Sequence, residues 1–328
     1  MSGQGTHPLI SVVVVNYNGI QFLKNCLSSI YQQKFTPYEV ILVDNASIDG
    51  SAEYVRKKFP DVKIFVQSSN SGFAGGANTG IREAKGEFIL TLNNDTIAGP
   101  EFIEELFFPM ISDPDIGMCA SKMVLPDGRI NSTGICISKS GEPWDRGGGQ
   151  PDDGQFDSPE EVFGPCAGAA LYRRSMLEEI GLFDEDFFLY FEDVDLAFRA
   201  QLSGWKCVYV PKACIVHVHG GTAGFKSDIS IYYVNRNLVW YIVKNFPART
   251  FFRYLPWIVL RNTADIFYYA CNGMLFTIVR AKKDMLRGIP NMIKKRKQIK
   301  KTVSDASIEN WILQWRPIRS RQHVDHKI

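Results

Sequence analysis

Residues 9–16, Leu-Ile-Ser-Val-Val-Val-Val-Asn, form an apolar run that ends in a polar side chain. Similar runs follow it, and stretches with the apolar spacing of helices separate them. Strand and helix alternate in this way in βαβ units, which build a parallel sheet. The first run does not alternate with polar residues, so we expect helices on both faces of the sheet. The predicted strands are 9–15, 40–43, 62–66 and 88–92, and the predicted helices are 20–31, 52–59 and 77–84.

Polar residues follow the predicted strands at their carboxyl ends. They are Asn16-Tyr17-Asn18 after the first strand, Asp44-Asn45 after the second and Asn93-Asn94-Asp95 after the fourth. The carboxyl ends of parallel strands meet at one edge, where open α/β sheets bind their ligands. The pattern therefore predicts a site for a nucleotide-like ligand.

The second half of the chain is less regular. A segment rich in Gly, Asp, Ser and Pro at 138–161 predicts a long mobile loop, and loops of this length are commonly lids or binding loops. From about residue 229 the chain is helical and aromatic, so we predict an α/β domain at 1–228 and a helical region at 229–328. Within the first domain the further predicted elements are helices at 174–180 and 192–202 and strands at 206–210 and 213–218.

Composition limits the class of protein. Of the 328 residues 45% are hydrophobic, 22% are charged and the formal net charge is +2, which excludes a compositionally disordered chain and gives no global reason to expect a nucleic-acid partner. Seven scattered cysteines without a CxxC pair indicate neither a disulfide framework nor a zinc ribbon. Residues 1–8 lack the features of a signal peptide, and no apolar stretch reaches the ~18 residues of a spanning helix. We expect a cytoplasmic protein in which Ile266–Val279 forms a buried or interfacial helix.

Positive charge is concentrated in one stretch. Between Arg280 and Lys301 there are ten Lys or Arg residues and one acid, Asp284. Such a block is either a solvated segment or, less commonly, a patch for anionic lipid or nucleic acid.

A glycine-rich motif, Asn70-Ser-Gly-Phe-Ala-Gly-Gly-Ala-Asn78-Thr-Gly80, follows the third predicted strand. Glycines before a helix allow a phosphate or base to approach the backbone, and the helix N-terminus favours anions. The motif is neither a dinucleotide fingerprint after the first strand nor a Walker loop. A plain helix-entry turn is the alternative.

Asp95 ends the fourth predicted strand and presents a carboxylate to the ligand edge. It is either a turn or N-cap residue or a ligand for a hard cation such as Mg²⁺ or Mn²⁺. The second role matters because a diphosphate leaving group needs its developing charge neutralised.

Three acids, Glu192, Asp193 and Asp195, follow an almost purely aromatic run. The first helical turn favours acids, and Asp195 can pair with Arg199 one turn later. Glu192 and Asp193 stand beside aromatic residues, where desolvation raises the pKa of a carboxyl group and suits a general base.

His217 and His219 lie two residues apart in a predicted strand and so share a face. A histidine at the end of a strand is either a satisfied structural residue or a metal ligand.

Seven motifs occur in the order found in one protein family. They are Val13-Val14-Val15-Asn16-Tyr17-Asn18, Val43-Asp44-Asn45-Ala46-Ser47, Gly72-Phe-Ala-Gly-Gly-Ala-Asn78, Leu92-Asn-Asn-Asp95, Gly181-Leu-Phe-Asp184, Phe191-Glu192-Asp193-Val-Asp195 and His217. The set resembles the family-2 glycosyltransferases of GT-A fold, and among these the rhamnosyltransferase-like branch. The resemblance covers about residues 9–245. It implies an α/β fold with a Rossmann-like, mainly parallel mixed sheet, a donor-binding half at about 1–97 and an acceptor-binding half at about 98–228.

This resemblance also implies roles for individual residues. Asp95 would bind Mg²⁺ or Mn²⁺ although Asn93 replaces the first acid of that motif, and His217 would complete the metal site, with His219 as the alternative. Asp193 would be the general base, with Glu192 as the alternative. Tyr17 and Asp44 would contact the base and ribose of the donor. The donor site as a whole would comprise Asn16, Tyr17, Asn18, Asp44, Asn70, Gly75, Gly76, Asn78 and Asn94.

The implied reaction is an inverting, metal-dependent sugar transfer, possible donors being dTDP-rhamnose or a UDP-sugar. The acceptor would be a saccharide or a polyprenyl-linked sugar, as in O-antigen or capsule synthesis, and the aromatic helices and basic block would place the protein on an anionic membrane surface. Trp144 and Arg146 are candidates for a lid, with an irregular surface loop as the alternative. A non-catalytic nucleotide-sugar-binding protein of the same fold is the competing class.

Overall fold

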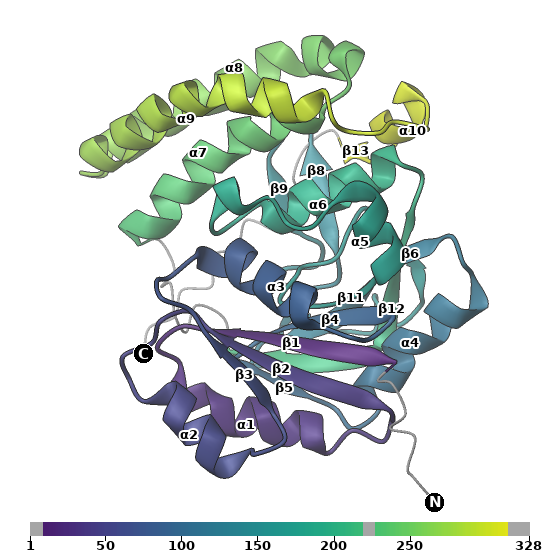
Figure 1. Cartoon of the computed structure of the whole chain (residues 1–328). Helices are drawn as coiled ribbons and strands as arrows, with labels where there is room; N and C mark the ends of the chain where they lie inside the picture. The colour runs from purple at the N-terminus through teal and green to yellow at the C-terminus, as the bar shows by residue number, and fades with distance from the viewer. Residues whose placement is uncertain (1–8, 219–226, 314–328) are drawn as a thin grey trace, which may run out of the picture.

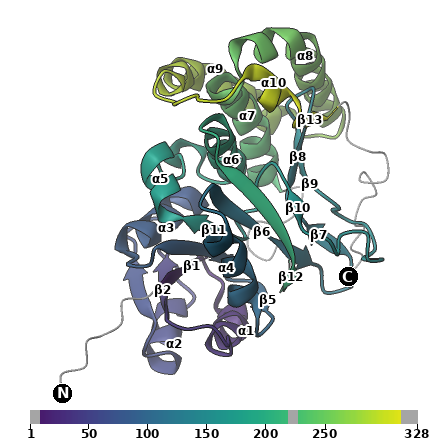
Figure 2. The same cartoon turned by 90° about the vertical axis from the view of Figure 1, so that its right-hand side faces the viewer.

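The computed structural model describes residues 9–218 and 227–313. Within these residues a ten-stranded mixed sheet crosses the molecule, with helices on both faces (Figures 1 and 2). Its strand order is β10-β12-β6-β11-β4-β1-β2-β3, with β5 beside β12 and β7 beside β6. The strands are β1 (Ile10–Asn16), β2 (Tyr38–Asp44), β3 (Lys63–Val66), β4 (Phe88–Asn93), β5 (Thr96–Ala98), β6 (Ile116–Val124), β7 (Ile130–Ser132), β10 (Glu160–Glu161), β11 (Ala169–Arg173) and β12 (Lys206–His217).

A second sheet in the described residues has the order β13-β8-β9. Its strands are β8 (Ile135–Ser138), β9 (Pro143–Asp145) and β13 (Ile312–Leu313). The helices are α1 (Ile20–Tyr31), α2 (Ser51–Lys58), α3 (Gly72–Glu83), α4 (Phe102–Ser112), α5 (Arg174–Ile180), the short 3₁₀ helix η1 (Glu185–Phe187), α6 (Glu192–Leu202), α7 (Asp228–Asn245), α8 (Ala248–Cys271), α9 (Leu275–Arg296) and α10 (Asp305–Glu309).

Strand β1 explains why the first apolar run lacks alternation. Val12 and Val14 belong to the core that α1, α2 and α4 complete on one face of the sheet. Val13 belongs to the core on the other face, with residues of α3 and α6. Both faces are covered, so successive positions 12–15 of the strand all carry apolar side chains.

The strand register brings the predicted polar residues to one edge. Asn16 at the end of β1 pairs in register with Asp44 at the end of β2, and Val15 pairs with Asn93 at the end of β4, all in parallel. Strand β11 runs antiparallel to β4 and β6. The prediction of a mixed, mainly parallel sheet is therefore confirmed.

Three predictions for the second half need correction. The loop expected at 138–161 contains β9 and β10, and Arg129 bridges to Pro151. The two strands expected at 206–218 are one strand, β12, with register shifts along it. The helix expected at 266–279 is interrupted, since α8 ends at Cys271 and α9 begins at Leu275, because Gly273 adopts a φ of 78° that favours glycine.

The C-terminal helices lie above the sheet, next to α6 (Figure 1). Helix α7 begins where the boundary after residue 228 was predicted, and it packs against α6 and α9. Its Lys244 Nζ lies 2.7 Å from an oxygen of Asp184 and 2.8 Å from one of Asp195. Asp195 also accepts a 2.9 Å hydrogen bond from Arg199 Nε, as predicted from their spacing. In the described parts of the chain, none of the helices has both the length and the apolar character needed to cross a bilayer.

Candidate functional site

Hydrogen bonds join the ends of β1, β2 and β4. Asn94 Nδ2 donates to Asn16 Oδ1 at 2.7 Å, and Asn16 Nδ2 donates to Asp44 Oδ2 at 3.0 Å. The other carboxylate oxygen of Asp44 accepts the Ser47 amide at 2.8 Å. Asn16, Asp44 and Asn94 are all buried, so this network fixes the loops around the sheet edge.

Tyr17 is the exposed aromatic residue of this edge, with 39% of its surface accessible. The next residue, Asn18, has a φ of 48° and accepts the Ile48 amide at 2.9 Å with its side-chain oxygen. A Cβ on Gly19 would lie 2.1 Å from Asn94 Nδ2, so the chain must turn here through glycine. The tight turn leaves the Tyr17 ring accessible to a ligand.

The glycine-rich motif opens α3 as predicted, but its residues serve packing. A Cβ on Gly75 would lie 2.6 Å from Ser71, and one on Gly76 would lie 2.7 Å from Val15 of β1. Asn70 is half-buried and accepts the Gly72 amide at 2.8 Å. Gly76 thus allows α3 to approach the sheet and Gly75 leaves room for Ser71, while the expectation that both glycines line the donor pocket stays a prediction.

Asn78 is likewise buried away from the sheet edge. Its side-chain amide donates to Phe183 O at 2.8 Å and to Glu185 Oε1 at 2.9 Å, and its oxygen accepts the Phe183 amide at 3.0 Å. The expected donor contact is corrected to a link between α3 and the segment before η1.

Asp95 and His217 lie together, as the sequence predicted. Their Oδ1 and Nε2 atoms are 3.2 Å apart, and both side chains are buried. His217 Nδ1 lies 2.7 Å from Asn131 Oδ1, and this contact orients the imidazole ring with Nε2 toward Asp95. Asn93 Nδ2 lies 3.3 Å from the same Nε2 atom. His219 lies outside the described residues.

Asp95 and His217 supply part of the ligand set that a divalent cation needs. Two acceptor atoms that face each other at 3.2 Å are stabilised by a cation or a proton between them. The described residues contain no group of three or more His, Cys, Asp or Glu side chains placed to hold a metal ion. Mg²⁺ and Mn²⁺ take few protein ligands where substrate phosphates supply the others, so a two-residue set is adequate.

Glu192 and Asp193 begin α6 in a desolvated position. Glu192 is buried, its Oε2 has no hydrogen-bond partner in the described structure, and burial together with Asp193 raises the pKa of its carboxyl group well above the usual range. Burial raises the pKa of Asp193 to about 6, and the nearby Asp145 adds to this. Two neighbouring carboxyl groups with raised pKa values thus lie together at the start of α6.

A short segment joins these acids to the Asp95–His217 pair. The Ala167 amide donates to Asp193 Oδ2 at 3.4 Å, and the carbonyl of Gly168 accepts the Asn93 amide at 2.8 Å. A Cβ on Gly168 would lie 3.0 Å from Asn93 Nδ2. Two consecutive residues therefore hold the acid pair and the end of β4 in fixed relation.

The predicted lid residues lie in the β8–β9 hairpin. Trp144 is buried within β9. Arg146 forms an ion pair with Glu160 and lies 4.6 Å from the ring centre of Phe156. Contacts with the surrounding residues hold both side chains in place. Their role as a lid stays a prediction.

Sequence reasoning missed three residues that act on the acid pair. Asp145 separates the two lid candidates and raises the pKa of Asp193. Arg236 and Asn237 of α7 hold the backbone that leads into Glu192. In the sequence, the one indication of such a role was that Arg236 and Asn237 are polar residues within an aromatic helix.

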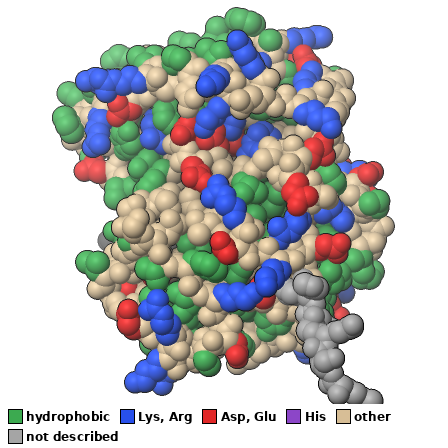
Figure 3. Space-filling view, in the orientation of Figure 1, with side chains coloured by type: hydrophobic (Ala, Val, Ile, Leu, Met, Phe, Trp, Pro, Cys, Tyr) green, Lys and Arg blue, Asp and Glu red, His purple; other side chains and the backbone are tan. Residues whose placement is uncertain are grey.

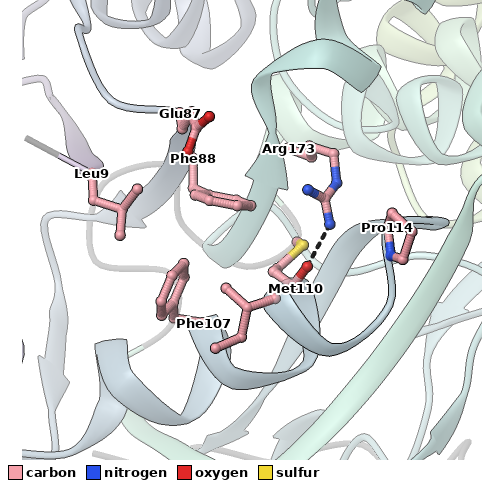
Figure 4. A pocket seen from close by; sticks show the side chains of 8 residues that line it. Leu9, Glu87, Phe88, Phe107, Met110, Pro114 and Arg173 are labelled. Atoms are coloured by element: carbon pink, nitrogen blue, oxygen red, sulfur yellow. Dashed lines mark hydrogen bonds between the residues drawn. The ribbon is translucent and has the colours of Figure 1, made fainter.

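A cavity of about 420 Å³ lies away from this site, at the opposite ends of β1 and β4 (Figure 4). Leu9, Phe88, Phe107 and Met110 line it, and Arg173 crosses it to donate to the Met110 carbonyl at 2.6 Å. Nε and Nη2 of Arg173 donate to backbone carbonyls, so the guanidinium contributes to holding the cavity wall together.

Comparisons with known proteins agree with this geometry. The model of "Glycosyl transferase family 2" matches residues 11–181, and that of "Glycosyltransferase like family 2" matches residues 162–242. The chain belongs to glycosyl transferase family 2, and it is a glycosyltransferase similar to the rhamnosyltransferase-like branch. One relative is N-acetylglucosaminyl-diphospho-decaprenol L-rhamnosyltransferase of Mycobacterium tuberculosis, which is 28% identical in an alignment of 244 positions that covers 66% of this chain and 78% of that protein.

Solved structures show the same fold. Residues 1–349 of S. aureus TarS in complex with UDP-GlcNAc match with a TM-score of 0.57 at 19% identity, covering 87% of this chain and 82% of that one. The mannosyltransferase PcManGT from Pyrobaculum calidifontis, in complex with GDP-Man and Mn²⁺, matches with a TM-score of 0.54 at 17% identity over 93% of this chain and 88% of that one. The fold is therefore the GT-A fold with an added C-terminal helical region.

Proposed function

We propose that this glycosyltransferase inverts the anomeric centre of its donor, with Asp193 as the general base. The acceptor hydroxyl gives its proton to the Asp193 carboxylate while its oxygen bonds to the anomeric carbon. The bond from that carbon to the diphosphate oxygen breaks, and the nucleoside diphosphate leaves with the electron pair. The observation that carries this proposal is the desolvated acid pair fixed beside the Asp95–His217 pair.

Glu192 lies next to the proposed base. Burial and the neighbouring Asp193 raise the pKa of Glu192 well above the usual range, which disfavours a second negative charge beside Asp193. With a pKa of about 6, Asp193 is mostly ionised at pH 7.5 and still basic enough to accept a proton in the transition state.

Asp95 and His217 would hold a divalent cation, Mg²⁺ or Mn²⁺. Such an ion, when bound, neutralises charge on the departing diphosphate. The Nδ1 contact to Asn131 supports this role because it orients the ring with Nε2 toward Asp95.

The donor contacts we propose are Tyr17, through stacking on the base, and the polar network of Asn16, Asp44 and Asn94, with Asn18 and Asn70 at its margins. The similarity to the mycobacterial enzyme favours dTDP-rhamnose as donor and a polyprenyl-diphosphate-linked sugar as acceptor, while the TarS complex makes a UDP-sugar the alternative.

The experiment that tests this proposal is a calorimetric titration with dTDP, UDP and GDP, each with and without Mn²⁺. We expect metal-dependent binding of one nucleotide by the parent protein, and loss of the metal dependence in Asp95→Asn. Absence of binding of all three nucleotides would contradict the donor site. Nucleotide binding with no release of nucleotide from any sugar donor and lipid-linked acceptor would favour the non-catalytic alternative.

We also propose that the outer surface of α8 and α9 rests on an anionic membrane at the cytoplasmic face. More than half of the exposed large hydrophobic side chains in the described residues belong to these two helices, among them Phe252, Phe267, Phe276 and Leu286. Figure 3 shows hydrophobic side chains together with Lys and Arg along the upper margin, over these helices. Such a surface would bring the site close to a lipid-linked acceptor.

The Lys and Arg residues between Arg280 and Lys301 have different surroundings in the folded protein. Lys282 is buried, and Lys295, Lys300 and Lys301 form ion pairs with acids of the chain. The exposed members that flank the apolar side chains of α9 are Arg280, Lys283, Lys294 and Lys297. This mixture of apolar and basic side chains suits an interfacial helix pair on anionic lipid.

A further inference from the structure

The segment that leads into the acid pair has a strained backbone. Phe188, Tyr190 and Phe191 have φ angles of 65°, 67° and 71°, in a region that bulky side chains rarely adopt. Such a conformation is strained and persists only where the surrounding structure fixes it. The last of the three immediately precedes Glu192.

Asn237 of α7 binds this strained segment directly. It is fully buried, and its Nδ2 lies 3.0, 2.9 and 2.7 Å from the carbonyl oxygens of Phe187, Leu189 and Tyr190. One side-chain amide thus gathers three carbonyls of a four-residue stretch. These carbonyls are not paired within a regular helix or sheet. The buried amide supplies the hydrogen bonds that such an element would otherwise provide.

Arg236 supports the same contacts. Its Nη2 donates to the carbonyls of Asp186 and Phe187 at 2.8 and 2.9 Å, and its Nε donates to Asn237 Oδ1 at 2.9 Å. Its guanidinium lies 4.1 Å from the ring centre of Trp240. The arginine therefore fixes the orientation of the Asn237 amide as well as the start of the segment.

The other side of the segment is held by α3. The carbonyl of Phe188 accepts the Ala74 amide at 3.3 Å, and a Cβ on Gly72 would lie 2.2 Å from that carbonyl oxygen. The segment is thus confined between α3 and α7. Glu192 and Asp193 follow directly after its carboxyl end.

From these contacts we propose that Asn237, supported by Arg236, is a positioning residue for the glycosyl transfer: it holds residues 187–191 in the strained conformation that places Asp193 against the acceptor. This proposal rests on the proposed function, in which Asp193 is the base. Asn237 Nδ2 contacts backbone carbonyls alone, so we expect donor affinity to be independent of it.

The test compares two buried asparagines of the same helix. Asn235 is also buried, but its Nδ2 donates to Ile231 within α7, and it has no hydrogen bond to residues 187–191 among those described. We expect Asn237→Ala to lower kcat at least tenfold relative to Asn235→Ala, with the Kd for the donor nucleotide within twofold of the parent in both. The assay is nucleotide release from the donor identified by titration, with a short-chain polyprenyl-diphosphate sugar as acceptor.

The pH profile supplies a readout that general destabilisation would not move. Asp193 faces Glu192 on its own helix, Asp145 of β9, Tyr172 of β11 and Cys166 of the loop before β11. Release of the segment admits water to the acid pair, so we expect the acid limb of kcat in Asn237→Ala to shift to lower pH than in Asn235→Ala. Asn237→Ser, which keeps one donor, takes the place of Asn237→Ala if the latter does not fold.

Three outcomes are distinct. A kcat and pH profile in Asn237→Ala and Asn237→Ser equal to those of Asn235→Ala would overturn the positioning role. An active Asp193→Asn variant, measured in parallel, would instead overturn the proposed base. Loss of activity in Asp193→Asn together with a selective loss in Asn237→Ala supports both.

Discussion

The Nε2 atom of His217, at the end of β12, lies 3.2 Å from Oδ1 of Asp95, which follows β4. These residues are 122 positions apart in the sequence, yet β12 continues past β6 to pair with β5 and places His217 opposite Thr96. The position of the candidate metal pair is therefore a property of the antiparallel β5–β12 pairing.

We expect His217→Ala to weaken metal-dependent nucleotide binding by about tenfold or more, because a ligand pair is reduced to one carboxylate. Calorimetry with and without Mn²⁺ measures this. Asn131→Ala, which removes the contact to Nδ1 and leaves both ligands, should weaken it less. Equal metal dependence in His217→Ala and the parent would refute the assignment.

Asp193→Asn should reduce turnover at least a hundredfold while nucleotide affinity stays nearly unchanged, since general bases typically contribute about 10²–10⁴-fold. Retention of more than a tenth of the parent activity would exclude Asp193 as the base. Glu192→Gln serves as the comparison, because the raised pKa of Glu192 favours its neutral form, which a carboxamide resembles.

The activity should fall on the acid side of about pH 6. The reaction needs the Asp193 carboxylate, and its pKa is raised to about 6, so protonation below this value removes the base. A kcat profile for the parent that stays flat down to pH 4.5 is incompatible with this assignment.

Gly76→Ala should destabilise the fold by about 1–2 kcal/mol, because the added Cβ would lie 2.7 Å from Val15 Cγ1 and overpacking exceeds the intrinsic helix gain of alanine. Thermal unfolding measures the change. Gly99→Ala is the matched control, since its Cβ would meet the Cys214 carbonyl at an ordinary 3.6 Å. If the two variants unfold alike, the close packing of α3 on β1 is not what the glycine provides.

The double variant Phe276→Ser with Leu286→Ser should reduce co-sedimentation with vesicles containing anionic lipid, since it removes two exposed apolar side chains from α9. Phe108→Ser, which changes an exposed phenylalanine of α4, should leave binding unchanged. Failure of the parent to bind anionic vesicles at low salt would remove the membrane proposal altogether.

The sequence by itself determined the layered α/β architecture, because apolar runs and helical spacing are local patterns that the strands and helices must satisfy. It also determined the polar edge, since residues that follow parallel strands share one end of the sheet, as Asn16, Asp44 and Asn93 do. The Asp195–Arg199 pair was predictable for the same reason, because one helical turn separates the two side chains.

Tertiary structure alone decided what these residues contact. Gly76 belongs to a motif that suggests a binding loop, and it lets α3 pack closely on β1, whereas Asn78 of the same motif hydrogen-bonds to Phe183 and Glu185. The pKa of Asp193 and the strained segment before it depend on burial and on α7, some 40 residues later in the chain. Burial and long-range contacts depend on how whole elements pack against one another. Local sequence patterns do not predict that packing.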